Sequence, residues 1–214
     1  MRFNPTRFDR HLANIGQQLL WRAAYACSCV NPSSGAPDPT CKLCGKKGRI
    51  WEDKAIQTVC GASGQKTQAE WANMSMWEAG DMVVTIPQNS PMWDSGQFDR
   101  VTMVNATDRF SLPLKRGAPN ENLSLYTVKS IDRVFWKHPQ TGVLVTGGIP
   151  AVSESGQLTW SSNEPPMGVT YSITGWRHVE YFVWGDFPSS RNEHSGMRLP
   201  KRVVLRRWDL LGRG

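Results

Sequence analysis

The apolar residues near the N-terminus recur at the spacing of an amphipathic helix. They follow one another at intervals of three and four and would form one stripe on a helix: Phe8, Leu12, Ile15, Leu19 and Ala23. Asn4 can cap the first turn, and Pro5 suits the first helical position. The pattern therefore predicts one helix over residues 4–26, with its apolar stripe packed on its own domain or on a neighbouring subunit.

Further along, the pattern changes to short β-rich runs that are bounded by Pro, Gly and Asn. The predicted strands are Arg49–Trp51, Ile56–Val59, Met82–Ile86, Phe98–Val104, Arg109–Leu112, Tyr126–Lys137, Val143–Thr146, Gly156–Trp160, Val169–Ile173 and Val179–Trp184. We expect the first two to pair with each other, and Tyr126–Lys137 to form a hairpin with Val143–Thr146. Residues 61–73 are small and polar and are predicted to form a loop.

Four of the five cysteines form two close pairs, Cys27 with Cys29 and Cys41 with Cys44. The loop between the pairs is rich in Pro, Gly, Ser and Asn, so it can fold back and bring them together. The second pair leads into a Gly-Lys-Lys-Gly turn at 45–48, where backbone N–H groups can approach thiolate sulfurs. Four thiolates suit tetrahedral Zn²⁺ and leave no open position, so we expect a structural zinc site.

Two other interpretations of these cysteines stay open, namely disulfides and reduced core thiols. The chain shows no secretory signal and Cys-x-Cys cannot easily close on itself, which disfavours disulfides. Clustering beside Pro and Gly is not typical of cysteines that only pack a core. Cys60 could replace Cys27 or Cys29 as the fourth ligand, but we expect it to be a buried free thiol.

These patterns together predict a mainly β fold: a small β-barrel or sandwich with an N-terminal amphipathic helix and a four-cysteine zinc knuckle. The expected division is an N-terminal helix at 1–26, a zinc-knuckle segment at 27–60, a loop or arm at 61–79, a β-barrel or sandwich domain at 80–197, and a basic C-terminal strand or arm at 198–214.

Charge adds a second possible kind of partner. The net charge of +7 and the pI of about 9.4 are compatible with binding to nucleic acid or to an acidic protein surface. A C-terminal run of cations is the candidate contact: Arg198, Lys201, Arg202, Arg206, Arg207 and Arg213. The alternative is that these residues lie on a solvated strand face.

The ten tryptophans are a high count for 214 residues. Tryptophan is enriched at interfaces, although several could simply fill a β-sheet core. Trp71, Trp77 and Trp93 fall in or beside predicted loops, where a monomer could not easily bury them. We therefore expect these side chains and the helix stripe to form contacts between subunits.

No stretch approaches the ~20 apolar residues of a membrane span, and the N-terminus lacks the apolar core of a signal peptide. We expect synthesis in a cytoplasm, with reduced thiols and no membrane partner. The sequence contains no P-loop, dinucleotide-binding, nucleophile-elbow or metalloprotease motif. The four histidines are scattered, without convergent partners for acid–base chemistry: His11, His138, His178 and His194. We therefore expect no enzymatic activity.

Several segments resemble β-rich structural proteins of tailed bacteriophages. They are Gly80–Pro87, Ser90–Val101, Arg109–Ser111, Cys41–Arg49, Glu180–Pro188 and Leu199–Val203. Within that group the chain is most similar to the neck components that join portal to tail, which are head–tail connector, adaptor or stopper proteins. The simplest stoppers lack a cysteine cluster, so the zinc knuckle would be an insertion, and a collar, tail or baseplate ring component stays open.

The resemblance implies a virion protein without enzymatic activity. It implies a ring of identical subunits around a central DNA passage, built on a small β-barrel whose loops and arms reach neighbours. The implied partners are portal or adaptor proteins, tail proteins and the packaged DNA.

A second function follows from the residues alone. The cysteine cluster with Lys42, Lys46, Lys47 and Arg49 nearby could be a zinc-ribbon module that binds nucleic acid. The aromatic residues are spread through predicted strands and form no obvious stacking platform, which favours the virion protein. An enzyme of unrecognised type is the third alternative.

Overall fold

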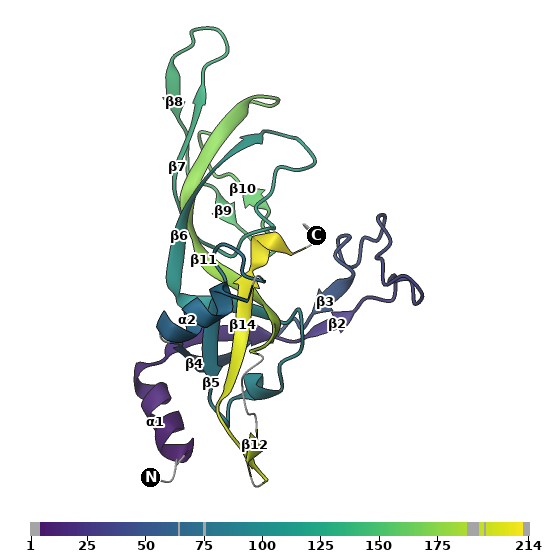
Figure 1. Cartoon of the computed structure of the whole chain (residues 1–214). Coiled ribbons are helices and arrows are strands. Elements are labelled where there is room, and N and C mark those ends of the chain that lie inside the picture. Colours follow the sequence, from purple (N-terminus) through teal and green to yellow (C-terminus); the bar gives the residue numbers. More distant parts are fainter. Residues whose placement is uncertain (1–4, 64, 75, 188–192, 195, 212–214) are drawn as a thin grey trace. The chain divides into compact units, whose positions relative to one another are not determined.

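The computed structural model describes residues 5–63, 65–74, 76–187, 193–194 and 196–211, and shows a mainly β chain with an N-terminal helix (Figure 1). The predicted fold class is confirmed. The helices are α1 (Pro5–Ile15) and α2 (Gln65–Ala72), with 3₁₀ turns η1 (Pro91–Asp94) and η2 (Trp208–Leu210). The strands are β1 (Gln17–Arg22), β2 (Ala24–Ala26), β3 (Arg49–Trp51), β4 (Ile56–Ala62), β5 (Met82–Ile86), β6 (Arg100–Lys115), β7 (Val128–Lys137), β8 (Leu144–Thr146), β9 (Ala151–Val152), β10 (Leu158–Thr159), β11 (Thr170–Asp186), β12 (Glu193–His194), β13 (Met197–Arg198) and β14 (Lys201–Arg207).

Eight strands form one sheet in the order β14-β5-β4-β1-β6-β11-β7-β8. β14 also pairs with β11, so the pairings among β14, β5, β4, β1, β6 and β11 return to their first strand. A closed circuit of this kind leaves few unpaired strand edges. β7 and β8 continue the sheet beyond the circuit as an antiparallel pair, so the predicted hairpin is confirmed.

The chain divides into two compact units. Unit 1 comprises Met1–Asn105 and Glu180–Gly214, and unit 2 comprises Ala106–Val179. This division differs from the predicted β domain over 80–197, because β1, β4 and β14 lie outside that range yet belong to the same sheet. β6 and β11 each have residues in both units.

Each unit has its own apolar core. In unit 1, one cluster contains Trp71, Val83, Phe187 and Val204, with Met74 and Trp184 against it. In unit 2, the buried residues are Phe110, Leu123, Val134, Trp136, Tyr171 and Ile173. The two clusters show that each unit buries aromatic side chains of its own.

The N-terminal helix is shorter than predicted, because α1 ends at Ile15 and the chain turns at Gly16 into β1. A side chain at position 16 would collide with the backbone carbonyls of Leu12 and Cys60. Leu19 then becomes a buried strand residue, paired with both β4 and β6. Pairing on both edges of β1 outweighs the helical spacing of its apolar residues. Asn4, the predicted cap, lies outside the described residues.

The predicted loop over residues 61–73 is wrong at residues 61–62, which end β4, and at residues 65–72, which form α2. Trp71 lies on this helix and is buried, and its Nε1–H donates to Asp81 Oδ2 at 3.0 Å. The side chain of Gln68 adds two bonds to Val83, one from Nε2 to the carbonyl oxygen at 3.0 Å and one from the backbone N–H to Oε1 at 3.1 Å. These tertiary bonds explain a helix that the local composition did not indicate.

Several predicted strand boundaries are also wrong. The predicted strands Phe98–Val104 and Arg109–Leu112 are parts of one strand, β6, which begins at Arg100, and Val169–Ile173 and Val179–Trp184 are parts of β11, which begins at Thr170. The pairing of β1 with β6 covers only Arg100 to Met103 of β6. Pro113 lies beyond this paired stretch, where the N–H that proline lacks is not needed for pairing with β1. β3 pairs with β2 rather than with Ile56–Val59, which belongs to β4 and pairs with β1.

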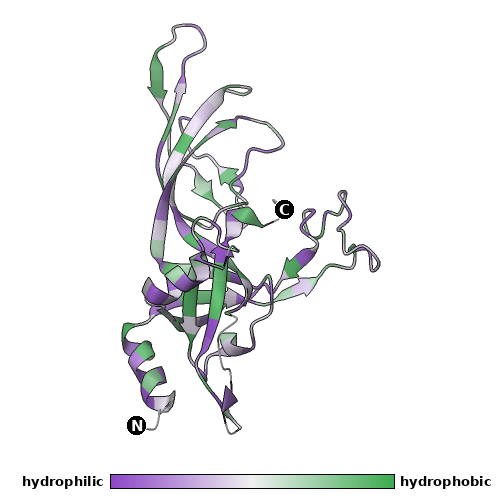
Figure 2. Ribbon diagram, viewed as in Figure 1, coloured by the Kyte–Doolittle hydropathy of each residue, from purple (hydrophilic) through white to green (hydrophobic). Residues whose placement is uncertain are grey.

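Polar and apolar residues alternate around α1 (Figure 2). Leu12 is buried on its inner side, whereas Ile15 is 68% exposed. Neither helix in the described part of the chain has the length and apolar character needed to cross a bilayer.

Candidate metal centre

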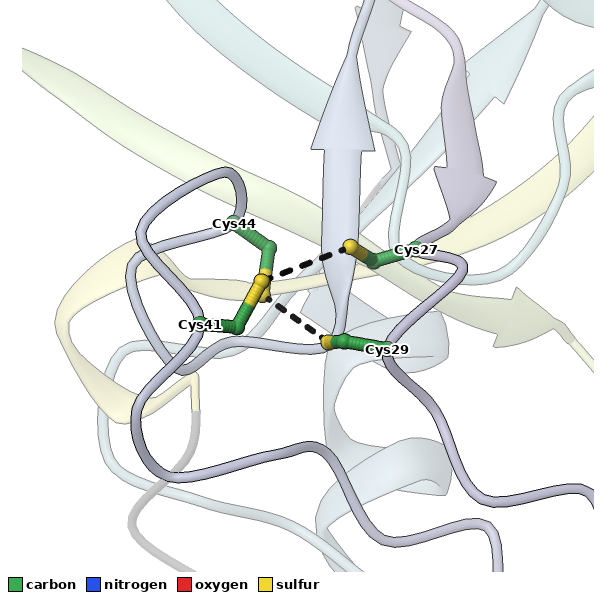
Figure 3. A group of neighbouring side chains, drawn as sticks. All are labelled: Cys27, Cys29, Cys41 and Cys44. Atoms are coloured by element: carbon green, nitrogen blue, oxygen red, sulfur yellow. Dashed lines mark hydrogen bonds between the residues drawn. The ribbon is translucent and has the colours of Figure 1, made fainter.

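The four predicted ligands converge in unit 1 (Figure 3). The Sγ atoms of Cys27 and Cys41 lie 3.9 Å apart, and those of Cys29 and Cys44 lie 3.5 Å apart. All four Sγ atoms lie within 4.8 Å of one another. A tetrahedral ion with metal–sulfur bonds of about 2.3 Å has sulfur–sulfur edges of about 3.8 Å. The cluster therefore has the dimensions of a site for one metal ion.

The same distances argue against the disulfide alternative. A disulfide joins two sulfurs at about 2.05 Å, and the five cysteines are all free thiols. Cys27 and Cys44 are buried, and Cys29 and Cys41 are half-buried. Four free thiols that face one another around a common centre are arranged as ligands rather than as core packing.

Two short strands hold the cysteine pairs together. β2 leads directly into Cys27, and β3 begins directly after Gly48. Ala26 pairs with Arg49, and the N–H of Cys27 donates to the carbonyl oxygen of Gly48 at 3.0 Å. This ladder joins the ends of the loop that carries the ligands, so the first cysteine pair is fixed against the second.

The turn after Cys44 has the backbone shape of a knuckle. Gly45, Lys46 and Gly48 have positive φ angles of 56°, 72° and 67°. A Cβ at position 48 would approach the Pro37 side chain to 3.1 Å, so glycine is needed there for space as well as conformation. The N–H of Gly48 donates to Cys44 Sγ at 3.3 Å, as expected for a backbone donor beside a thiolate ligand.

The thiols differ in how readily they ionise. Burial raises the pKa of Cys29 to about 12. Burial also acts to raise the pKa of Cys44, but the Gly48 N–H and the neighbouring thiols outweigh it and lower that pKa to about 7. Cys44 is therefore converted more easily than Cys29 to the thiolate that a metal requires.

Cys60 lies outside the cluster. It is on β4, opposite Gln17 of β1, and is 1% exposed. Burial raises its pKa to about 12. This agrees with the expected buried free thiol and removes the basis for its role as a fourth ligand.

Lys47 connects the knuckle to the C-terminal part of unit 1. Its Nζ lies 4.7 Å from the centre of the Trp208 ring and 5.7 Å from that of Trp51. The two rings meet edge to face at 4.9 Å. Burial, reinforced by the nearby Arg100 cation, lowers the pKa of Lys47. A residue of the ligand loop is thus packed against two contacting aromatic rings, one from β3 and one from η2.

These contacts also bear on the zinc-ribbon alternative. Arg49 lies 4.7 Å above the ring of Phe98, whose carbonyl oxygen accepts from Trp51 Nε1 at 2.9 Å. Lys47 and Arg49 are therefore engaged within the chain, whereas Lys42 and Lys46 are exposed. Two exposed lysines form a weak phosphate-binding surface, so the knuckle is better suited to a structural role.

Asp99 anchors the strand that leads to the first cysteine pair, a role that sequence analysis did not find. Its carboxylate accepts from Trp21 Nε1 and the Ala24 N–H, both at 2.8 Å, and from the Gly96 N–H at 3.0 Å. Burial raises the pKa of Asp99 and outweighs these three hydrogen bonds, which act to lower it. An Asp inside a predicted strand, here Phe98–Val104, carries no sequence signal for these contacts.

The basic C-terminal run was expected to be exposed, and this expectation is wrong at two of its central positions. Lys201 and Arg206 on β14 are 7% and 8% exposed. Arg206 makes two bonds to Asp81, from Nε at 3.0 Å and from Nη2 at 2.9 Å, and lies 3.9 Å above the Trp184 ring. Lys201 pairs with Asp186 at 2.9 Å. Both cations are neutralised inside unit 1.

The other described members of the run also have partners in the chain. Arg198 pairs with Asp94 at 3.2 Å, and Arg207 pairs with Asp209 at 3.6 Å. Arg202 lies 6.0 Å from the centre of the Phe187 ring. Arg213 lies outside the described residues. The run is thus largely part of the architecture of unit 1.

The histidines are placed on separate elements. His11 and His194 are exposed, and the backbone N–H of His178 donates to Thr127. His138 sits in the hairpin turn, where its Nδ1 accepts from the backbone N–H groups of residues 140 and 141 at 3.4 and 3.3 Å. This is a turn-stabilising contact.

Comparison with known proteins adds no assignment: no protein-family model matches the chain, and no curated protein matches it significantly.

Proposed function

We propose that the chain is a structural component of a bacteriophage virion that assembles into a ring of identical subunits at the head–tail neck, around the DNA passage. Its partners would be portal or adaptor and tail proteins, and the four-cysteine cluster would hold a structural Zn²⁺. The starting point is the resemblance of the segments Gly80–Pro87, Ser90–Val101 and Glu180–Pro188 to neck proteins. A collar, tail or baseplate ring remains the alternative position.

The observation that carries the assembly proposal is the exposed apolar surface. The described residues include large apolar side chains that are at least 39% exposed: Ile15, Tyr25, Leu43, Ile56, Met76, Trp77, Leu125, Val143, Leu144, Ile149, Met167, Trp176 and Met197. Soluble monomers keep contiguous apolar surface small, whereas subunits of an assembly cover it with their neighbours. Met76 with Trp77 and Val143 with Leu144 are consecutive exposed pairs.

The three tryptophans that were expected to form subunit contacts differ in how deeply they are buried. Trp71 is buried on α2, so its assignment to a loop and to an interface is wrong. Trp93 is half-buried, and its Nε1–H donates to the Leu199 carbonyl at 2.8 Å. Trp77 is 48% exposed and remains a candidate contact, together with Ile15 at the end of α1.

The donor set supports zinc in a structural role. Four cysteine sulfurs would fill a tetrahedral coordination shell, so no position remains for water or substrate. Soft thiolate ligands in this geometry select zinc or iron–sulfur chemistry, and a mononuclear site with a knuckle turn is typical of zinc. The ion would hold the loop of residues 27–48 closed on the β2–β3 ladder.

The test of the assembly proposal is the structure of the assembled particle by cryo-electron microscopy. We expect a ring of copies of this chain in which Trp77 and Ile15 are buried between subunits. A particle in which both side chains stay open to solvent, or which holds no ring of this chain, would refute the proposal.

A variant test complements the imaging. Trp77→Glu should reduce incorporation of the chain into particles, because a charge would be placed in an apolar contact. Asn73→Glu, at an exposed polar position nearby, is the control and should leave incorporation unchanged. Equal incorporation of both variants would remove Trp77 from the interface.

A further inference from the structure

One face of the sheet in unit 2 carries exposed polar residues on β6 and β7, on either side of Thr174 of β11, which is 7% exposed. Along β6, Phe110, Leu112 and Leu114 pack against the core of unit 2. Side chains alternate across a strand, so the residues between them point the opposite way. The alternate set, Arg109, Ser111, Pro113 and Lys115, is exposed. We call this side of β6, β11, β7 and β8 the outer face.

Strand pairing continues the outer face across the sheet. Ser111 Oγ lies 3.0 Å from Thr174 Oγ1 on β11, and Thr174 is opposite Arg133 on β7. Phe135 of β7 lies opposite Ser172 of β11 on one side and Thr146 of β8 on the other. Lys137 of β7 lies opposite Leu144 of β8. Val134 and Trp136 of β7 are buried between these positions. Arg109, Lys115, Arg133 and Lys137 thus lie on one face, and all four are exposed.

The carboxylates of unit 2 are mostly placed elsewhere. Glu121 and Glu164 bind Arg116 at 3.1 and 2.6 Å, and Glu121 also accepts from Tyr171 on the core side. Asp108 alternates with Arg109 and so lies on the Phe110 side of β6. Glu154 is in the turn before β10.

Asp132 is the acidic neighbour of the outer face. It lies at the bulge between Arg133 and Ile131 and accepts from Ser130 Oγ at 3.4 Å. One carboxylate against four cations leaves the face positively charged.

We propose that the outer face of unit 2 binds the phosphate backbone of double-stranded DNA. The four cations would neutralise phosphates, and the hydroxyls of Ser111, Thr146 and Ser172 would donate to phosphate oxygens. Arg109 and Lys115 are six residues apart on β6, which is about 20 Å of strand. One DNA strand presents a phosphate about every 3.4 Å along the helix axis, so the face spans several phosphates.

The chemistry of the face favours a phosphate backbone over other partners. A protein interface needs an apolar centre, but the exposed apolar side chains on this face are two, Trp176 and the Leu144 paired with Lys137, and Phe135 is half-buried 5.3 Å from the Arg133 guanidinium. Single-stranded nucleic acid needs a series of stacking rings, which two separated aromatic residues do not provide. The choice of DNA among polyanions rests on the proposed neck function, whereas the surface itself follows from the charge distribution.

The test measures binding of the full, metal-loaded chain to a labelled 30-base-pair duplex of random sequence by fluorescence anisotropy, from 50 to 200 mM salt. The face variant carries Arg109→Gln, Lys115→Gln, Arg133→Gln and Lys137→Gln. We expect it to bind about 10 to 100 times more weakly at 50 mM salt. The slope of log K against log salt should become shallower by about three to four, since each neutralised phosphate contributes about −0.9.

The matched control carries Lys42→Gln, Lys46→Gln, Lys54→Gln and Lys66→Gln, which are exposed positions in unit 1. Both variants lower the net charge of +7 by the same four charges. Circular dichroism and a thermal melt check that both stay folded. Near wild-type binding by the control, with loss in the face variant, would support the proposal.

Three results would overturn it. Equal weakening in both variants would show that binding follows net charge alone. Polyglutamate that competes as well as DNA, charge for charge, would identify an acidic protein as the partner. A wild-type chain that does not bind the duplex at 50 mM salt would also refute DNA binding. The ring proposal is judged separately, because particle structure and incorporation do not depend on this measurement.

Discussion

Strand β14 of unit 1 and the outer face of unit 2 place their cations in opposite environments. In unit 1, Arg206 is buried against Asp81, and Lys201 is buried against Asp186. In unit 2, Arg133 and its neighbours on the outer face are exposed, while the core-side Arg116 takes up two of the carboxylates. A cation removed from water needs a partner, and an exposed one does not. A basic run in a sequence therefore does not identify a basic surface.

The units also differ in what holds them together. Unit 1 joins segments from both ends of the chain and contains the cysteine cluster, whereas unit 2 is one continuous segment closed by an aromatic core. β6 shows the difference within one strand. It buries Val101 and Met103 in unit 1 and Phe110 in unit 2, with the half-buried Leu112 on the same side as Phe110, so the buried positions change from odd to even residue numbers. We expect perturbations of the cysteine cluster to be confined to unit 1.

Removal of the metal should produce the largest effect and the sharpest contrast between the units. Structural zinc in small modules contributes roughly 10 kcal/mol or more of apparent binding energy, and it is coupled to folding of the ligand loop. Cys41→Ser, or a chelator, should therefore strip hydrogen-exchange protection from β2, β3 and residues 27–48. Protection of β7 in unit 2 should change little. Exchange with mass spectrometry measures both.

Elemental analysis supplies the stoichiometry for this experiment. We expect one zinc per wild-type chain and one per Cys60→Ala chain, because Cys60 is outside the cluster, but none in Cys41→Ser. A wild-type chain without stoichiometric metal would contradict the zinc site. Equal loss of protection in both units would contradict their separation.

The buried ion pair of unit 1 gives the next largest effect. Arg206→Ala leaves the side chain of Asp81, which is 0% exposed, as an unpaired charge, so we expect a loss of about 3–5 kcal/mol in the free energy of unfolding. Arg198→Ala, which breaks an exposed pair with Asp94, should cost about 1 kcal/mol or less. Denaturant unfolding measures both. Similar costs for the two variants would show that burial of the pair does not govern its contribution.

The Lys47 contact tests how the knuckle is joined to the rest of unit 1. Lys47→Met keeps the apolar stem but removes the cation between Trp51 and Trp208, and we expect a loss of about 1–2 kcal/mol. The same change at the exposed Lys46 should cost less than about 0.5 kcal/mol. Tryptophan fluorescence should also shift in the first variant. An unchanged spectrum and unfolding midpoint would mean that the cation adds nothing to this packing.

The smallest expected effect is a pH dependence of the free energy of unfolding that comes from Asp99. Because burial raises its pKa in the folded chain, the folded state holds this proton to higher pH than the unfolded state does. The contribution of Asp99 to stability is thus greatest below the unfolded pKa of about 3.9 and falls as pH rises through the folded pKa, by at most about 1.4 kcal/mol per pH unit.

Asp99→Asn isolates this contribution. The stability of the wild type minus that of Asp99→Asn should decrease with rising pH in this acidic window, as measured by denaturant unfolding. A difference for Asp99→Asn that increases with pH would mean that its three hydrogen bonds outweigh burial.

The sequence by itself determined the features that depend on local spacing and residue chemistry. Two close cysteine pairs with a glycine turn sufficed to predict the four ligands, because the loop between Cys29 and Cys41 can close in few ways that bring four thiols together. Alternating β-branched and aromatic residues predicted the β7–β8 hairpin around a Pro-Gly turn. Pro5 placed the start of α1. Each of these patterns involves residues that are close in sequence, so it can be recognised without knowledge of the fold.

The tertiary structure decided everything that depends on partners distant in sequence. Leu19 continues the helical spacing of the N-terminal apolar residues, but it lies in β1 because β4 and β6 pair with the two edges of that strand. Trp71 is buried because Asp81 and Phe187 meet it on α2. Arg206 is internal because β14 pairs with β5, which brings it to Asp81. These interactions gain their free energy from partners 10 to 125 positions away in the sequence, and no local pattern records those partners.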